Sequence, residues 1–273
     1  MKNSMTLPRL ADEEIERYSR HILLREVGAA GQRRLLAASA FVVGAGGLGS
    51  PALLYLAAAG VGNIGIADSD IVDLSNLPRQ VVHRTGDVGK SKVASAAQAI
   101  REINPGCRVS PFPCRLTDAN VSGILDGYDV VLDGSDNFPT RFLVADCCYG
   151  AGIPLVSAAA IRFEGQLMTV LPGKGNPCYR CFIPEPPPPE SCPACSQVGV
   201  LGAVTGVMGT LQAAEALKLL MGVGELLSHR LLVYDALRCR FLIAERTVDP
   251  HCPLCGATPV AESPPSPDAG RSP

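Results

Sequence analysis

The sequence has little excess charge of either sign and no block of consecutive basic residues. Its 24 Lys and Arg residues nearly balance its 26 Asp and Glu residues, for a formal net charge of -2. Proteins that bind nucleic acids usually concentrate Lys and Arg on one surface or along one segment. The composition therefore argues against a nucleic-acid partner.

A continuous apolar segment is also missing from the first twenty residues, which carry Lys, Arg, Asp and Glu throughout. A signal peptide or a membrane-spanning helix needs such a segment. We therefore expect a cytoplasmic protein. In that compartment the eleven cysteines are expected to serve metal binding or chemistry rather than disulfide bonds.

Hydrophobic residues make up 47% of the 273 residues, enough for a buried core in one large domain. Short apolar strands alternate with helical stretches up to about residue 160, which predicts an α/β fold with a Rossmann-like, doubly wound, mostly parallel sheet. The strands are expected at 40–43, 63–67, 108–112, 129–132 and 154–158. The helices between them are expected at 51–59, 90–103 and 139–149.

The two ends of the chain differ from this alternating pattern. Before it, Asp12 is expected to cap a helix that runs to about residue 25, with Ile15, Tyr18, Ile22 and Leu23 on one apolar face. After it, apolar runs at 166–171 and 231–234 predict added antiparallel strands, because no regular crossover helices separate them from their neighbours. Between these runs lie a loop rich in Cys and Pro at 172–198 and a helix at 205–221. The Pro-rich tail 257–273 is expected to be disordered.

A glycine loop, GAGGLGSP at 44–51, follows the first expected strand. Gly44, Gly46 and Gly49 fit the pattern G-x-G-x-x-G, with Ser50 as the helix cap and Pro51 in the first turn. Such a loop lets backbone N–H groups approach an anion at the positive end of a helix. Asp68 ends the next strand, where a carboxylate usually binds ribose hydroxyls. By itself the loop favours a dinucleotide, NAD or FAD, with ATP or a tight glycine turn that binds no ligand as the alternatives.

The residues that follow the loop favour ATP. Asn76 and Arg79 come just after the second strand in SNLPRQ, and Lys92 follows in VGKSKV. Two cations and an amide suit a triphosphate better than a nicotinamide. In LDGSDN, Asp133 and Asp136 stand at the carboxyl end of a strand, where open α/β sheets bind ligands. Asp136 is expected either to hold Mg²⁺ through oxygen or to cap the following helix.

The cysteines include two C-x-x-C pairs, Cys178 with Cys181 and Cys252 with Cys255. Four thiolates without a histidine suit a closed, tetrahedral, structural zinc site. A redox disulfide is the alternative for such pairs. A third pair, in the loop at 172–198, is not needed for this zinc and could supply a nucleophilic thiol; it consists of Cys192 and Cys195.

Eight motifs together resemble the ThiF/MoeB/HesA adenylyltransferases, relatives of the ubiquitin-activating enzymes. They occur in order between residues 13 and 256. The motifs are RYSRHI, GAGGLGSP, DSD with SNLPRQ, VGKSKV, LDGSDN, PCYRC, GVLGAVTGVMGTLQAAEALK and HCPLCG. The resemblance implies that MgATP binds and that the C-terminal Gly-Gly carboxylate of a small ubiquitin-like sulfur carrier (MoaD/ThiS-like) attacks its α-phosphate. Acyl-adenylate and pyrophosphate would result.

The resemblance also implies roles for individual residues. Gly47 would lie under the phosphates, Asp68 would bind the ribose, and Asp136 would hold magnesium with Asn137 near the adenine. The triphosphate contacts would come from Asn76, Arg79 and Lys92. Other positions that the resemblance places at the nucleotide are Gly44, Gly46, Gly49, Asp70, Ser75 and Leu77.

Partners and domain organisation follow from the same resemblance. Arg20 matches an arginine that reaches the ATP of the other subunit, which implies a homodimer. Cys195 matches a cysteine that links to the activated carrier in some members, although its surroundings differ and a Cys192–Cys195 disulfide is an alternative. One adenylyltransferase domain would cover 1–256, with N-terminal helices at 10–37, a nucleotide-binding half at 38–160 and a carrier-binding half at 161–256. No rhodanese domain is expected, so a separate protein, such as a cysteine desulfurase or a rhodanese, would donate sulfur.

Three other functions compete with carrier adenylylation. An NAD-dependent oxidoreductase would explain the glycine loop with Asp68, but four histidines, His21, His83, His229 and His251, offer no obvious catalytic pair. A non-catalytic scaffold for a ubiquitin-like protein would usually lose the charged residues that are present here. Adenylylation of a small molecule or a modified tRNA would use the same ATP chemistry. The motifs do not distinguish the molybdopterin, thiamine and tRNA-thiolation pathways.

Overall fold

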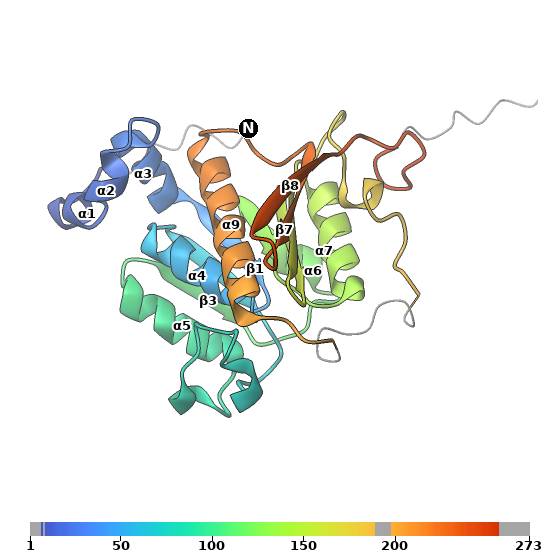
Figure 1. The fold of residues 1–273 in the computed structure, drawn as a ribbon. Helices are drawn as coiled ribbons and strands as arrows, with labels where there is room; N and C mark the ends of the chain where they lie inside the picture. The colour runs from blue at the N-terminus through green and yellow to red at the C-terminus, as the bar shows by residue number, and fades with distance from the viewer. Residues whose placement is uncertain (1–6, 8, 189–197, 257–273) are drawn as a thin grey trace, which may run out of the picture.

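A single sheet of eight strands organises the computed structural model, which describes residue 7 and residues 9–188 and 198–256. The strand order is β3-β2-β1-β4-β5-β6-β7-β8 (Figure 1). The tail 257–273 and the cysteine pair Cys192 and Cys195 lie outside the described residues. Within the described part of the chain, no helix has the length and apolar character needed to cross a membrane.

The first five strands are parallel, as the alternating pattern predicts. They are β1 (Ser39–Val43), β2 (Asn63–Ala67), β3 (Arg108–Phe112), β4 (Val130–Asp133) and β5 (Leu155–Ile161). The helices between them are α4 (Gly49–Ala58), α5 (Lys92–Ile103), α6 (Val121–Leu125) and α7 (Phe138–Ala151). Since α4 and α5 cover one face and α6 and α7 the other, the sheet is doubly wound (Figure 1). The strand order reverses between β1 and β4, which is where such sheets bind ligands.

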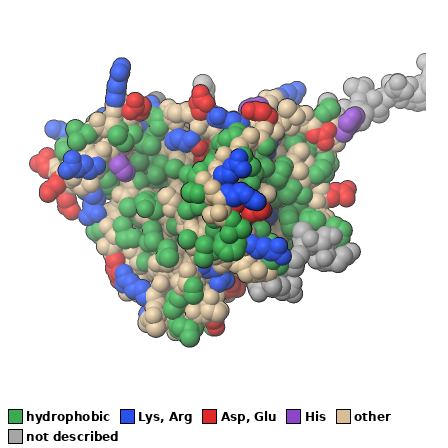
Figure 2. Space-filling model, viewed as in Figure 1, with side chains coloured by type: hydrophobic (Ala, Val, Ile, Leu, Met, Phe, Trp, Pro, Cys, Tyr) green, Lys and Arg blue, Asp and Glu red, His purple; other side chains and the backbone are tan. Residues whose placement is uncertain are grey.

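Three antiparallel strands extend the sheet, which confirms the predicted change after residue 163. They are β6 (Glu164–Val170), β7 (Arg230–Asp235) and β8 (Arg240–Glu245). Strand β8 was not predicted from the sequence, because each of its residues is exposed and no alternation of apolar and polar positions marks it. Large apolar side chains of β8 and of the turn before it are therefore exposed: Leu237, Phe241, Leu242 and Ile243. On the face shown in Figure 2, hydrophobic side chains reach the surface beside Lys and Arg side chains.

Helix α9 (Gly202–Met221) packs across the sheet and is held by buried polar side chains (Figure 1). The Gln212 amide donates to the carbonyl oxygens of Asp133 and Val156, at 2.9 and 2.8 Å. The Glu215 carboxylate accepts from the Thr169 hydroxyl at 2.7 Å and from the backbone N–H of Leu227 at 2.9 Å. Because buried polar groups are costly when unpaired, these bonds specify where α9 lies on β4, β5 and β6.

The N-terminal segment forms three helices rather than one long helix to residue 25. They are α1 (Asp12–Arg17), α2 (Ser19–Ile22) and α3 (Gly28–Ala37). The break is at Tyr18, whose buried hydroxyl accepts from the Asn104 amide at 2.9 Å. The predicted apolar face was wrong for Ile15 and Leu23, which are exposed.

Two predicted helix caps were also wrong. Ala11 stands at the N-cap of α1, so Asp12 is already helical. Leu48 stands at the N-cap of α4, so Ser50 and Pro51 lie inside its first turn. Both helices begin one or two residues earlier than the side-chain pattern indicates.

Substituting Gly209 tests the packing of α9 against α4. A Cβ atom at Gly209 would meet the carbonyl oxygen of Leu48 and the Pro51 ring, whereas a Cβ at Gly206 in the same helix meets nothing within 4 Å. We expect Gly209→Ala to destabilise the fold by about 2 kcal/mol, which is roughly 4–8 °C in Tm. Gly206→Ala, the matched control, should leave Tm unchanged or raise it slightly. Equal melting temperatures for the two variants would contradict the packing described.

Candidate functional site

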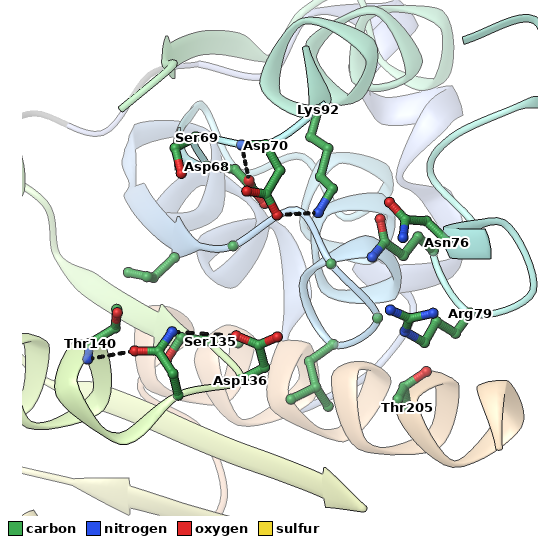
Figure 3. Close-up of a pocket in the computed structure, with 18 of the residues that line it drawn as sticks. Asp68, Ser69, Asp70, Asn76, Arg79, Lys92, Ser135, Asp136, Thr140 and Thr205 are labelled. Atoms are coloured by element: carbon green, nitrogen blue, oxygen red, sulfur yellow. Dashed lines mark hydrogen bonds and ion pairs between the residues drawn. The ribbon is translucent and has the colours of Figure 1, made fainter. Parts of the chain in front are cut away.

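A cavity of about 910 Å³ opens at the carboxyl ends of β1, β2 and β4, at the point where the strand order reverses (Figure 3). Its walls come from the glycine loop, the segment after β2, the turn after β4 and the start of α9. Its volume falls within the range usual for small-molecule sites. Most of the residues predicted for a nucleotide line it: Gly44, Gly46, Gly47, Asp68, Asp70, Ser75, Asn76, Arg79, Lys92, Asp136 and Asn137.

The glycine loop forms one wall, and three of its glycines have different reasons to lack a side chain. Gly44 has a φ of +86°, which favours glycine. A Cβ at Gly47 would press against the Thr205 side chain at 3.1 Å. Gly49 does not line the cavity, but a Cβ there would collide with the carbonyl oxygen of Gly44. Gly49 therefore allows the first turn of α4 to approach the loop.

Asp68 joins the end of β2 to the glycine loop. Its carboxylate accepts from the backbone N–H of Ala45 at 2.8 Å and from that of Asp70 at 2.9 Å. Since a carboxylate has lone pairs for about four hydrogen bonds, Asp68 can still accept from a ligand hydroxyl.

Lys92 places a cation in the same wall. It is the first residue of α5, and its side chain is only 8% exposed. The ammonium lies 2.8 Å from the Asp70 carboxylate, whose side chain is 66% exposed (Figure 3). The backbone N–H of Lys92 also donates to the carbonyl oxygen of Asp70 at 3.0 Å. These two bonds hold the lysine at the cavity before any ligand enters.

A short 3-10 helix, η1 (Leu74–Asn76), presents the polar groups that follow β2. Asp73 caps it by accepting from the backbone N–H of Ser75 at 2.8 Å, and hydrogen bonds from the side chain and the backbone of Ser75 hold the pKa of the Asp73 carboxyl below its usual value. The Arg79 guanidinium donates to the carbonyl oxygen of Ser75 at 3.0 Å, which directs it along the cavity wall. The predicted Leu77 is not among the lining residues.

Asp136 lies across the cavity from Arg79 and Lys92 (Figure 3). The cap of α7 is Asn137, whose side-chain oxygen accepts from the backbone N–H of Thr140 at 3.0 Å. Its amide nitrogen lies 3.3 Å from a carboxylate oxygen of Asp136. The alternative role for Asp136 as the helix cap is therefore wrong, and its carboxylate is available to the cavity.

The cavity is also lined by residues to which the motifs assign no role: Gln80, Ser135, Arg141 and Thr205. Gln80 immediately follows Arg79, and its side-chain oxygen is buried without a partner among the described residues. Arg141 lies one helical turn after Asn137, and its guanidinium donates to the carbonyl oxygens of Ala158, at 2.8 Å, and Ser135. Helical spacing from Asn137 was the signal that could have found Arg141.

Among the described residues, the predicted Arg20 is not brought to this cavity. Arg20 is exposed on α2 and does not line it. In Figure 1, α1, α2 and α3 lie to one side of the molecule, beyond α4. Cys195 lies outside the described residues.

The four predicted cysteines form a second cluster, with all four sulfur atoms within 4.8 Å of one another. The Sγ of Cys178 lies 3.4 Å from that of Cys252, and the Sγ of Cys181 lies 3.2 Å from that of Cys255. Buried Arg246 donates to the carbonyl oxygen of Cys178 at 3.0 Å, which fixes the backbone beside the cluster. This arrangement can hold a metal ion.

Comparison with known proteins gives a family match over almost the whole described chain. The model of the ThiF family matches residues 18–256. The SAMP-activating enzyme E1 of Haloferax volcanii is 51% identical over 243 residues, covering 89% of each chain. The sulfur carrier protein adenylyltransferase of Thermus thermophilus is 48% identical over 256 residues, covering 92% of this chain and 94% of the relative.

A longer relative and a solved structure complete the comparison. The adenylyltransferase and sulfurtransferase MOCS3 of Bos taurus is 53% identical over 92% of this chain, which spans only 55% of that protein. The crystal structure of E. coli MccB with ATP matches with a TM-score of 0.75 at 24% identity, covering 88% of this chain and 74% of that one. That likeness supports the fold alone. Given the family model and relatives near half identity along their full lengths, the chain belongs to the ThiF family.

Proposed function

We propose that this protein adenylylates the C-terminal Gly-Gly carboxylate of a small ubiquitin-like sulfur-carrier protein. Relatives along the full chain are named a sulfur carrier protein adenylyltransferase and a SAMP-activating enzyme E1. The observation that carries the proposal is the cavity itself, in which Lys92 and Arg79 face Asp136 across the glycine loop. A carboxylate oxygen of the carrier attacks the α-phosphorus of ATP, and the bond from that phosphorus to the bridging oxygen breaks. Pyrophosphate leaves, and the carrier becomes an acyl-adenylate.

The main barrier to this reaction is repulsion between the carrier carboxylate and the triphosphate. Fixed positive charge at the site of attack lowers that barrier. Lys92, Arg79 and Asn76 are assigned to the triphosphate and Asp68 to the ribose, which places the phosphates over Gly46 and Gly47. In binding, the triphosphate takes the place of Asp70 as the main partner of Lys92. No side chain has to act as a nucleophile, because the carrier carboxylate is already ionised at neutral pH.

Asp136 and Asn137 fit a magnesium site, because an available carboxylate beside an amide offers the oxygen ligands that Mg²⁺ prefers. Asp136 would hold the ion, which when bound neutralises phosphate charge. Asn137 orients the Asp136 carboxylate through its amide while it caps α7.

The carrier tail approaches the cavity along the segment that leads into α9. Gly199, Val200 and Gly202, which follow the loop at 172–198, line the cavity there. Val200 forms a bridge with Arg162 at the tip of the β5–β6 hairpin, so this segment is joined to the antiparallel part of the sheet. We therefore assign residues 38–160 to nucleotide binding and 161–256 to the carrier. A separate protein would donate the sulfur in the next step.

Substituting Asp136 tests the reaction directly. We expect Asp136→Ala to reduce carrier-dependent ATP–pyrophosphate exchange more than about 100-fold, because the divalent ion loses its carboxylate ligand. Asp126→Ala, which removes an exposed carboxylate outside the cavity, should retain wild-type exchange. A panel of Gly-Gly-ending carriers supplies the second substrate. Full exchange by Asp136→Ala would refute the mechanism, and exchange by no carrier would favour a non-catalytic scaffold.

The four-cysteine cluster is proposed to be a structural zinc site. Ligand bonds of 2.3 Å in a tetrahedron place sulfur atoms about 3.8 Å apart. Three of the sulfur separations are 3.2, 3.4 and 3.9 Å, close to that value, and all four sulfur atoms lie within 4.8 Å of one another. Four thiolates and no open position suit a closed site. Its effect is to join the C-terminal segment to the segment around Cys178, because the two pairs lie 74 residues apart in the chain.

Metal analysis tests this site. We expect purified protein to hold about one zinc ion per chain, and chelation or Cys181→Ser to lower both zinc content and Tm. Cys239→Ser, which changes an exposed cysteine outside the cluster, should alter neither. Wild-type protein that contains no zinc, with a Tm insensitive to chelators, would exclude a structural zinc.

Arg20 is proposed to act in the site of a second subunit, because it does not line the cavity of its own chain. Arg20→Ala and Asp136→Ala should each abolish exchange when expressed alone. Co-expressed in one cell, they should form mixed dimers in which one site is complete, so that about a quarter of wild-type activity returns. If Arg20 acts within its own chain, co-expression restores nothing.

A further inference from the structure

A buried histidine that the proposed reaction does not use lies behind the glycine loop. His83 is 5% exposed and does not line the cavity. Its Nε2 lies 3.0 Å from the carbonyl oxygen of Ala45, and its Nδ1 lies 2.9 Å from the Ser95 hydroxyl on α5. His83 therefore connects α5 to the middle of the loop.

The Ala45 residue is held on both of its backbone groups. Its N–H donates to the Asp68 carboxylate at 2.8 Å, and its carbonyl oxygen accepts from His83. Ala45 is fully buried and stands between Gly44 and Gly46, which line the cavity. Glycine has the least restricted backbone of all residues, so a loop of this composition needs an external restraint. The two bonds to Ala45 supply it.

The hydrogen bonds also determine where the proton of His83 lies. A carbonyl oxygen can only accept, so Nε2 must carry the proton. In the neutral ring, Nδ1 is then an acceptor, and it accepts from Ser95 only when the single hydroxyl proton of Ser95 points to it rather than to Asp87. Burial lowers the pKa of His83, and nearby Lys92 lowers it further, against the raising effects of the Ala45 contact, Asp68 and Asp87. The neutral Nε2–H form is therefore the one expected at neutral pH.

Ser95, the contact of His83 on α5, is itself held in place by Asp87. The Ser95 hydroxyl oxygen also lies 3.0 Å from the Asp87 carboxylate, so its one proton is shared between two acceptors, Asp87 and the neutral Nδ1 of His83. Asp87 accepts in addition from Lys90 at 2.9 Å and from the backbone N–H of Arg84 at 3.0 Å. Asp87, Ser95 and His83 thus form a continuous connection to Ala45. The imidazole cannot move away without breaking it.

We propose that His83 is a positioning residue for the nucleotide: by holding the Ala45 carbonyl, it keeps the glycine loop in the conformation that accepts the phosphates. The role rests on the proposed ATP site but concerns a residue that does not touch the ligand. It differs from general support of the fold because it depends on one donated hydrogen bond, from Nε2 to Ala45.

Two substitutions distinguish the effect of losing that hydrogen bond from the effect of losing the volume of the ring. His83→Phe keeps the ring volume and removes the donor, whereas His83→Gln places an amide N–H near the position of Nε2. We expect His83→Phe to weaken ATP binding about tenfold in calorimetry and to raise KM for ATP in the exchange assay with little change in kcat. His83→Gln should stay within about threefold of wild type. His229→Phe, at an exposed histidine outside the cavity, is the control and should bind as wild type does.

Nuclear magnetic resonance of the ¹⁵N-histidine-labelled wild-type chain gives a second readout, which reports the proton position of His83 in the wild-type protein itself. The His83 signals, identified by their loss in His83→Gln, should show the Nε2–H tautomer at neutral pH. An Nδ1–H tautomer overturns the proposal, as does ATP binding by His83→Phe equal to wild type, or by His83→Gln as weak as His83→Phe. If the wild type itself binds no ATP, the proposed function fails instead, and the tautomer still decides whether His83 donates to Ala45.

Discussion

The close approach of α4 to the end of β1 is the constraint on which the cavity depends. A side chain at Gly49 would collide with the Gly44 carbonyl oxygen, and a side chain at Gly209 would collide with the Leu48 carbonyl oxygen behind it. Without these contacts the first turn of α4 could not lie against the loop, nor α9 against α4. The positive end of α4 would then be too distant to assist an anion in the cavity. The absence of a Cβ atom at Gly49 and at Gly209 therefore determines how closely α4 approaches the loop and how closely α9 approaches α4.

The charges of the cavity are arranged before a ligand arrives. Asp70 holds Lys92, Ser75 holds Arg79, and Asn137 holds Asp136, each through a hydrogen bond or ion pair from a neighbouring element. A site whose charged groups are already oriented loses little energy to reorganisation when charge develops in the transition state. This prearrangement suits a transfer reaction between two anions, in which positioning and neutralisation matter more than proton transfer.

The cysteine cluster and the cavity illustrate how much spacing alone can predict. Four cysteines in two C-x-x-C pairs were enough to predict the cluster, because the tetrahedral preference of a metal ion leaves few other uses for such spacing. The motifs around Asn76, Lys92 and Asp136 were likewise sufficient to predict that these residues meet, since the carboxyl ends of neighbouring parallel strands share one edge of the sheet. Strand β8 and the break at Tyr18 were missed, because an exposed strand shows no alternation and the Tyr18 contact with Asn104 joins residues far apart in the chain.

By itself, the sequence determined the parallel sheet, the glycine loop, the four-cysteine cluster and most of the cavity lining. Each of these depends on residue type at short spacing, or on strand order that hydrophobic patterning predicts. Only the tertiary structure decided that Asn137 rather than Asp136 caps α7, that Arg141 supports the turn after β4, and that His83 reaches Ala45. It also decided that Arg20 lies away from the cavity of its own chain. These features depend on the directions of side chains that meet only after the strands and helices have packed, and no local pattern encodes those directions.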